Sequence, residues 1–446
     1  MQTSILKIGF WTALPYADQG FLELHFFSKL TKFINAPYFK VKAWRKMVDL
    51  SECPVLDHHA HAFLPEKEDE KGATFAQFFH WTIAPENENE NYVLYRRVLK
   101  ELARVLKVKS KNPKDILAAR NKAYPYGNTE KQIAYISRLF DDAKISWLFF
   151  DTGYPSSEYP HSYDADSKSL GKTFKKQKFN FIIRFDKLFF RLFKATKTFD
   201  DVLDEFLDTI TNVVKKEGYI GYKSAIAYGY GLDIHDHDVK DARKAYEELR
   251  KKNLFALPLD EKMSKHPDII EKEKIVRDFL TCRGIETSIK LNVPIQIHTG
   301  IGESPIINVQ KCNPINLYDL LKDPKLGKAK FALLHAGYPY TEELAWLANS
   351  FANVNIDVSC TVPWIHVGVR QKMLQLFEMA PMNKIMYGSD GGKIPETHWI
   401  AAVLGKEGIS RALQDMVDSG FMDEDYAYKA GSWILYDNAK NLYRVK

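Results

Sequence analysis

The stretch VLDHHAHAF, Val55 to Phe63, starts with an apolar run and ends in three histidines. Residues two apart share one face of a strand. We therefore expect Asp57, His59 and His61 to point together, and His58 to point away as a structural or exposed residue. Two imidazoles on one side of a strand end can bind one cation at about 2.0–2.1 Å, the usual zinc–nitrogen distance. The stretch predicts a buried strand that ends in a metal site.

Seven further apolar runs follow this stretch along the chain. Most are nearly continuous in apolar character, which is typical of parallel strands covered on both faces, and the segments between them can hold helices. Eight such units in about 340 residues predict an α/β fold, a (β/α)8 barrel. The seven runs are ISWLFFD (145–151), FNFIIRFD (179–186), YIGYKSAIAY (219–228), VPIQIHTG (293–300), AKFALLHAG (329–337), NVNIDVSC (353–360) and NKIMYGSD (383–390).

The segments around the first run predict two additions to the barrel. Residues 1–50 carry aromatic residues and lysines at roughly helical spacing, so we expect a helical N-terminal extension there. Residues 66–140 are rich in polar, helix-favouring residues and predict a helical insertion after the first strand. We find no clean linker, so residues 51–446 are expected to form one barrel domain.

Composition narrows the partners of this chain of 446 residues. Lys and Arg number 63 against 57 Asp and Glu, and the resulting charge of +6 is too dispersed for a nucleic-acid surface. Four scattered cysteines without a CxxC motif fit a reducing cytoplasm. The sequence contains no run of about 18 apolar residues, so we expect no membrane-spanning helix. We expect a cytoplasmic protein that binds a small molecule, with a homo-oligomer left open.

Polar side chains lie at or near the ends of several runs, where a barrel of this kind builds its active site. They are His59, His61, Lys223, His298, His335 and Asp390. A second pair with the same spacing, His235 and His237, is embedded in charged residues before a helical pattern. Asp236 or Asp238 is interpreted there as a helix N-cap, so this pair is not expected to bind metal.

Six stretches, in this order, resemble the amidohydrolase superfamily. The resemblance is to its amidohydrolase-2 branch, and within that branch to the amidohydrolase-like half of nodulin/glutamine-synthetase fusion proteins. It implies that His59, His61, His298 and Asp390 hold the metal, with His335 as a second ligand or a catalytic histidine. The stretches are VLDHHAHAF, GYKSAIAYGYGL, VPIQIHTGIGE, FALLHAGYPYTEELAWLA, NVNIDVSC and KIMYGSDGGKIPE.

Histidines and a carboxylate suit a divalent ion, Zn²⁺ first and Mn²⁺ as an alternative, with a position left for water. The cation lowers the pKa of that water from about 15.7 toward about 7, so hydroxide is available at neutral pH. Asp390 is expected to take the proton and later give it to the leaving group. His335 is expected to polarise the carbonyl or stabilise the developing oxyanion.

Three more positions have competing interpretations. Lys223 can be carboxylated and bridge two metals, pair as an ammonium with a carboxylate such as Asp186, or face an anionic substrate group. The sequence therefore leaves open whether the site holds one metal ion or two. The guanidinium fork of Arg184 fits an acidic substrate, and a salt bridge to Asp186 or Asp151 is the alternative. Tyr338 is a candidate for lining the substrate pocket.

Three functions remain in view. The first is a metal-dependent hydrolase of an amide or related C–N bond, and the resemblance implies a γ-glutamyl or other acidic substrate. The second is a metal-dependent decarboxylase, or a uronate-isomerase-like enzyme, of the same superfamily. The third is a non-catalytic binding partner of a glutamine-synthetase-like protein.

Overall fold

The computed structural model describes residues 48–63, 75–79, 91–125, 127–152, 167–195, 197–303 and 306–446. Val48 to Lys446 form one compact unit. The helical extension expected over residues 1–50 falls almost wholly outside the described residues. The same holds for parts of the insertion expected over 66–140. The described residues contain no helix that is both long and apolar enough to cross a membrane.

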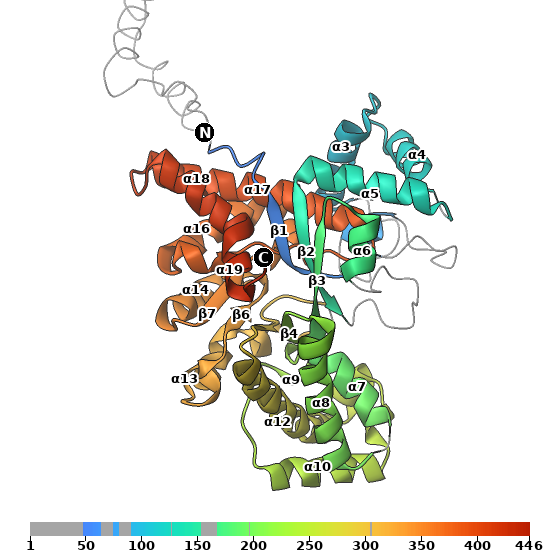
Figure 1. Cartoon of the computed structure of the whole chain (residues 1–446), viewed down its shortest axis with the longest axis vertical. Coiled ribbons are helices and arrows are strands. Elements are labelled where there is room, and N and C mark those ends of the chain that lie inside the picture. The colour runs from blue at the N-terminus through green and yellow to red at the C-terminus, as the bar shows by residue number, and fades with distance from the viewer. Residues whose placement is uncertain are drawn as a thin grey trace, which may run out of the picture. The chain divides into compact units, whose positions relative to one another are not determined.

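Each of the eight predicted runs overlaps one strand of a single parallel sheet, and the strands follow one another around it in sequence order. Figure 1 shows these strands in the middle of the unit with helices around them. The predicted (β/α)8 barrel is confirmed. Its strands are β1 (Val55–Ala60), β2 (Ile145–Thr152), β3 (Lys178–Arg184), β4 (Gly221–Ser224), β5 (Ile295–Ile297), β6 (Phe331–Leu333), β7 (Val354–Asp357) and β9 (Ile385–Met386).

Backbone hydrogen bonds close the barrel between β1 and the segment that follows β9. The Asp390 N–H donates to the His59 carbonyl at 2.9 Å, and the His61 N–H donates to the Gly391 carbonyl at 2.7 Å. The His58 N–H donates to Tyr387 at 3.3 Å. Closure therefore brings Asp390 beside His59, although more than three hundred residues separate them in the chain.

Helices between β1 and β2 pack together and against the last long helix, α17 (Pro395–Asp418). A buried contact between them joins Arg120 to Glu396 (Nε to Oε1, 2.7 Å), and the Tyr135 hydroxyl donates to the same oxygen at 2.8 Å. These helices are α3 (Val93–Leu106), α4 (Pro113–Ala123) and α5 (Thr129–Ala143).

A second group of helices follows β3 and β4. It lies toward the bottom of Figure 1, away from α3, α4 and α5. The third strand is shorter than its predicted run, because α7 begins at Phe185 and takes up Asp186 in its first turn. A carboxylate is favourable there beside the helix N-terminus. The group comprises α7 (Phe185–Lys194), α8 (Phe199–Glu217), α9 (Ala227–Tyr230), α10 (Val239–Lys251), α11 (Leu259–Lys265) and α12 (Pro267–Leu291).

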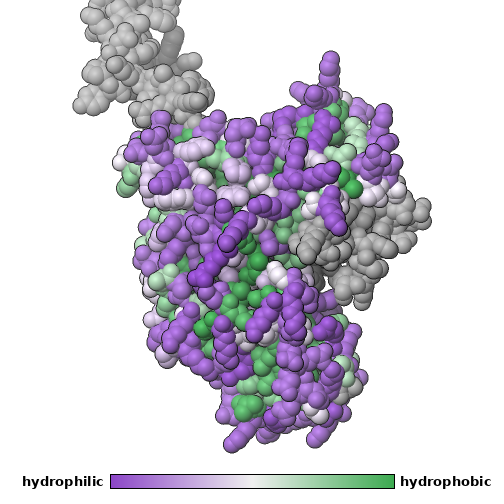
Figure 2. Space-filling model, in the orientation of Figure 1, coloured by the Kyte–Doolittle hydropathy of each residue, from purple (hydrophilic) through white to green (hydrophobic). Residues whose placement is uncertain are grey.

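The remaining helices complete the outer layer. Among them, α19 places Tyr443 against an apolar cluster made of inward-facing strand residues such as Leu56, Phe149 and Met386. In Figure 2 hydrophobic residues show near the middle of this face, over the strands, while hydrophilic residues cover the surrounding helices. The helices are α6 (Ser167–Thr173), α13 (Tyr318–Lys322), α14 (Thr341–Ser350), α15 (Thr361–Trp364), α16 (Val369–Met379), α18 (Glu424–Ser432) and α19 (Asn438–Tyr443).

Short elements connect these parts. A two-residue strand, β8 (Ser359–Cys360), follows β7, and one turn of π-helix lies at Trp433–Asp437. Turns of 3-10 helix lie at Phe75–Phe79, Leu254–Ala256, Val309–Cys312, Pro314–Leu317, Leu326–Lys328, His335–Gly337, His366–Gly368 and Met382–Lys384.

Candidate metal centre

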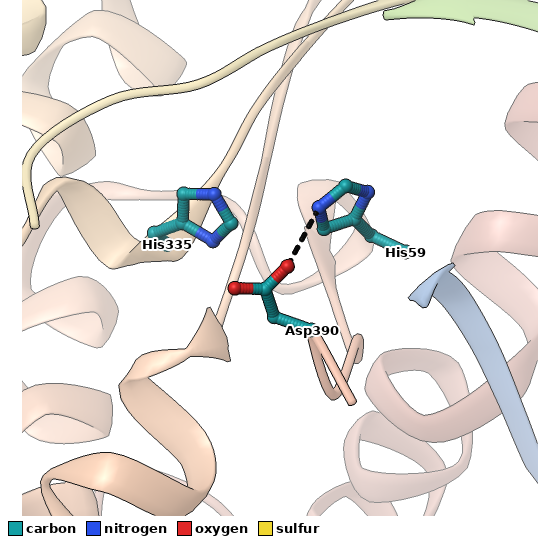
Figure 3. Close-up of side chains that lie close together, drawn as sticks. All are labelled: His59, His335 and Asp390. Carbon is teal, nitrogen blue, oxygen red and sulfur yellow. Dashed lines mark ion pairs between the residues drawn. The ribbon is translucent and has the colours of Figure 1, made fainter. Parts of the chain in front are cut away.

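His59, His335 and Asp390 bring metal-ligating atoms together at one end of the barrel, all within 4.8 Å of one another. Figure 3 shows the Asp390 carboxylate between the two imidazoles. His59 Nε2 lies 3.1 Å from Asp390 Oδ1, and the Asp390 side chain is 19% exposed while both histidines are buried. Three of the predicted site residues, from three separate strands, therefore meet.

His61 approaches the same carboxylate, with its Nε2 3.0 Å from Asp390 Oδ1. A second group of close ligand atoms consists of His59, His61 and Asp151, in which His61 Nδ1 lies 4.0 Å from Asp151 Oδ2. Asp151 was not predicted as a ligand. It ends the run ISWLFFD at the same rim, so the signal that pointed to Asp390 was present for Asp151 as well.

His298 contacts His335 instead of joining either group of ligand atoms among the described residues. Its Nε2–H donates to the Ile301 carbonyl at 2.9 Å, which leaves Nδ1 to accept from His335 Nε2 at 2.8 Å. The Ser359 hydroxyl can then donate to His335 Nδ1 at 2.9 Å. His335 thus lies between Asp390 and His298, and the ligand role of His298 stays a prediction.

Gln296 fixes the tautomer of His59. The Gln296 Nε2 donates to the His58 carbonyl and to the Tyr443 hydroxyl, both at 2.8 Å. Its Oε1 therefore faces His59 Nδ1 at 2.8 Å and accepts the proton on that nitrogen. Sequence reasoning missed Gln296, although a polar residue inside the apolar run VPIQI was a usable signal.

The charge state of this network fits a metal ion. Burial, and then the charge of Lys223, lower the pKa of His59, so its imidazole is neutral at neutral pH. With Nδ1–H donated to Gln296, the Nε2 lone pair of His59 faces a carboxylate oxygen of Asp390 at 3.1 Å. Two electron-pair donors at that distance call for a cation between them, and neutral imidazole with ionised carboxylate is the donor set that divalent metals need.

The neighbouring groups are held in the charge states that metal ligands need. Burial lowers the pKa of His298 and of His335 well below the usual value. Burial alone would raise the pKa of Asp390, but His335 and the contacts from His59 and His61 outweigh it and hold that pKa well below its usual range. Histidines that stay neutral and a carboxylate that stays ionised can ligate metal without first losing a proton.

The backbone at two of these positions is unusual. Asp390 and His335 have φ angles of 55° and 69°, in the left-handed region that few side-chain-bearing residues adopt. Asp and His tolerate this region better than most residues. Such conformations persist where the surrounding structure over-determines them, and they cluster at functional sites.

Lys223 lies buried in β4, and its Nζ has no hydrogen-bond partner within the described part of the chain. Burial lowers its pKa to about 8, with Arg184 acting in the same direction and Asp151 against it. The suggested pairing with Asp186 is not formed, because no ion pair joins these two described side chains and the Asp186 carboxylate accepts from the Ala225 N–H at 2.6 Å. Carboxylation of Lys223 stays a prediction.

Arg184 forms the salt bridge that was its alternative interpretation. Its Nε lies 2.9 and 3.1 Å from the two oxygens of Asp151, and its Nη2 contacts the same carboxylate. Arg184 also lines the cavity above the metal centre. Tyr338 does not line it: the Lys372 ammonium lies 5.4 Å from its ring. Tyr228 lines the cavity instead, with its ring centroid 4.7 Å from that of His298.

The predicted alternation along β1 is wrong at Asp57. The register between β1 and β2 shifts between Asp57 and Ala60, so simple alternation fails there. Asp57 accepts from the Ser389 N–H at 2.9 Å and does not face the site. His58 was predicted to be either structural or exposed, and it is structural: it is buried and its Nε2 lies 2.8 Å from Asp357 Oδ2.

Fold and site together define a class, a (β/α)8 barrel with a candidate histidine–carboxylate metal centre at its rim. Residues 226–445 of this chain, just under half of its length, match the family described as amidohydrolase. The resemblance found in the sequence is thereby confirmed at this level.

Individual proteins are similar to this chain over different parts of its length. Protein fluG of Emericella nidulans is 28% identical over 244 residues, which make up 54% of this chain and 27% of that protein. The chain thus spans about a quarter of the length of this curated relative. A Lactobacillus casei protein assigned as a metal-dependent hydrolase shares the fold, with a TM-score of 0.74 at 22% identity over 90% of this chain and 98% of that chain.

A third relative shows the same fold at lower identity. Uronate isomerase from Thermotoga maritima has a TM-score of 0.63 at 14% identity and covers 88% of this chain and 95% of that chain.

Proposed function

We propose that this protein is a metal-dependent hydrolase that cleaves an amide or related C–N bond of an acidic substrate. The observation that carries the proposal is the neutral His59 lone pair facing the ionised Asp390 across 3.1 Å. His59, His61 and Asp390 would hold the ion, with Asp151 beside them, and His335 or His298 would join them by exchanging the hydrogen bond between the two imidazoles for the metal. A divalent ion, Zn²⁺ first, supplies a water that ionises near neutral pH.

The protein's own residues would supply the proton transfers. Asp390 is ionised and 19% exposed, so it can accept a proton from water and pass it to the departing nitrogen. An amine leaves readily only as the protonated species, and a positioned acid–base group of this kind is worth about 10²–10⁴ in rate. His335, held by Ser359, can polarise the substrate carbonyl.

The lining of the cavity favours an acidic substrate. The cavity is about 600 Å³ and carries six Lys or Arg side chains against four carboxylates. Arg184 and Lys223 lie on it close to the candidate ligands, and Lys223 has no carboxylate partner among the described residues. Unpaired positive charge in a partly dry site favours binding of an anionic group. This agrees with a γ-glutamyl or similar acyl group.

Metal analysis and a substrate panel test the proposal. Freshly purified protein should contain one or two divalent ions per chain, lose activity with a chelator and regain it with Zn²⁺ or Mn²⁺. The panel offers γ-glutamyl amides, aromatic acids and uronates, and we expect release of amine. Release of CO2 or formation of a ketose would replace hydrolysis by decarboxylation or isomerisation. Protein without stoichiometric metal, and without activity after metal is added, would overturn the proposal.

A further inference from the structure

The cavity continues outward from the metal centre into an apolar chamber between α7, α11 and α12. Phe190 and Phe193 of α7 line it on one side, and Phe255 packs against Phe193 with ring centroids 4.5 Å apart. Leu257, in the connection before α11, and Leu259, the first residue of α11, also line it. This end of the cavity differs in chemistry from the histidine- and carboxylate-lined floor.

A buried charged group stiffens the wall of this apolar chamber. Arg277 of α12 donates through Nε and Nη2 to Glu273 Oε1, at 2.9 and 2.7 Å, and Lys262 Nζ lies 2.7 Å from Glu273 Oε2. The Arg277 guanidinium lies 4.6 Å from the ring centroid of Tyr230 and 5.4 Å from that of Phe193. Arg277 Nη1 also lies 4.0 Å from Asp186 Oδ1, so two cations face two carboxylates, and the Lys262, Glu273 and Arg277 side chains are nearly buried.

Size and chemistry together restrict the occupant of the chamber. A cavity of about 600 Å³ is in the range that encloses drug-sized ligands. A primary amide such as glutamine would fill only the floor and leave water against the phenylalanines. The acidic part of a substrate finds Arg184 and Lys223 at the floor, so the apolar chamber is left for the substituent on the amide nitrogen. A cationic substituent would lose its hydration against the phenylalanine and leucine side chains of the chamber, which disfavours it.

We propose that α7, α11 and α12 form a subsite for an uncharged aromatic or branched apolar substituent on the amide nitrogen. The substrate would then be an N-substituted amide of an acidic acyl group, and this assignment rests on the proposed hydrolase function. Hydrolysis breaks the C–N bond, adds the hydroxyl of water to the carbonyl carbon and places a proton on nitrogen. The products are a free acid and an apolar primary amine.

Three γ-glutamyl amides with similar leaving groups test the subsite: the methylamide, the benzylamide and the 4-aminobutylamide. We expect the benzylamide to have a KM at least tenfold below that of the methylamide, since burying an aromatic ring contributes about that much or more. The 4-aminobutylamide should not share this gain. Phe190→Ala removes a ring that is 47% exposed, so the fold should survive while the benzylamide advantage falls severalfold.

A matched control and a second variant sharpen the test. Phe421→Ala removes a phenylalanine that is 79% exposed and lies outside the cavity, and it should preserve the benzylamide advantage. Ala256→Trp places a large ring in the chamber and should weaken benzylamide binding more than methylamide binding.

Calorimetry separates the subsite from the reaction. Asp390→Asn protein, whose turnover should be about 10²- to 10⁴-fold slower, is titrated with the methylamide and the benzylamide. If the benzylamide binds tenfold more tightly than the methylamide, and Phe190→Ala in the same protein abolishes this difference, the subsite is supported. This holds even if no amide is hydrolysed and the proposed function fails. Equal affinities for the two amides, or a preference that Phe190→Ala leaves intact, overturn the subsite.

Discussion

Two histidine pairs in this chain have the same spacing and very different surroundings. His59 and His61 end β1, and both present Nε2 within 3.1 Å of Asp390 Oδ1. His235 and His237 precede α10, and the carboxylate that pairs with them is Asp278, whose Oδ2 lies 3.5 Å from His237 Nε2. Both residues of the first pair belong to one group of close metal-ligand atoms and His59 belongs to a second, whereas His235 and His237 belong to none within the described residues.

The carboxylate oxygen that faces the second pair is already engaged by other groups. Asp278 is already held by Lys274, with 2.7 Å between Nζ and Oδ2, and it also accepts from the His235 N–H at 3.2 Å. Asp238 caps α10 by accepting from the Lys240 N–H at 2.7 Å, as one of the two predicted caps. The comparison teaches that His-x-His spacing supplies two ligands, and that a carboxylate from a distant strand makes the site.

Removing that distant carboxylate should have the largest effect. Asp390→Asn keeps the shape of the side chain but removes the charge and the proton acceptor, so we expect metal content to fall below stoichiometry and hydrolysis to fall about 10²- to 10⁴-fold. Elemental analysis and steady-state rates measure both. His235→Ala is the matched control in the other pair, and a comparable loss of metal there would contradict the comparison.

The support of His59 should come next. Gln296→Leu leaves His59 Nδ1 without the oxygen that fixes its tautomer, so we expect metal affinity to fall about 10- to 100-fold. Competition with a chromogenic chelator measures the affinity. Unchanged affinity would show that Gln296 serves the barrel interior and not the metal centre.

Acid should destabilise the metal-free protein through the buried histidines of the candidate metal centre. The pKa values of His59, His298 and His335 are lowered on folding, so below about pH 6.5 the unfolded chain binds protons that the folded chain does not. The unfolding free energy should therefore fall with falling pH, by up to about 1.4 kcal/mol per pH unit for each histidine. Urea unfolding from pH 7.5 to 5.5 measures the slope, and His59→Gln should reduce it. A flat profile would contradict the buried neutral histidines.

The smallest effect is expected at the second pair. His237→Ala removes a part-exposed side chain whose Nε2 lies 3.5 Å from Asp278 Oδ2, an oxygen that the Lys274 ammonium also contacts. We expect the unfolding free energy to change by less than about 0.5 kcal/mol and the metal content to stay the same. Denaturant unfolding and elemental analysis check both, and a large loss of either would reveal a second metal site.

Much of the fold could be predicted from the sequence because barrel strands are local. The eight apolar runs each overlap a strand, since a strand buried on both faces needs only a short, nearly continuous apolar segment. The exact ends could not be predicted: Asp186 left the strand for the first turn of α7. The shift in β1 after Asp57 was also beyond a rule of simple alternation.

The candidate site was predictable in part for the same reason. Polar residues that end apolar runs pointed to His59, His61, His335 and Asp390, which the structure brings together. Gln296 and Asp151 are also polar residues within or at the end of an apolar run, but they were not predicted as site residues. Tyr338 and Tyr228 could not be told apart from sequence, because which tyrosine lines a cavity depends on how loops from different strands pack.

The sequence by itself determined the order of strands and the kind of side chain at each strand end, because both depend on short segments and on the fixed geometry of a β-strand. Only the tertiary structure decided which of those side chains touch. Closure of β1 against the segment after β9 places Asp390 at His59, and the packing of α7 and α12 places an apolar chamber beyond them. Contacts between residues hundreds of positions apart depend on the register of the closed barrel, which no local pattern contains.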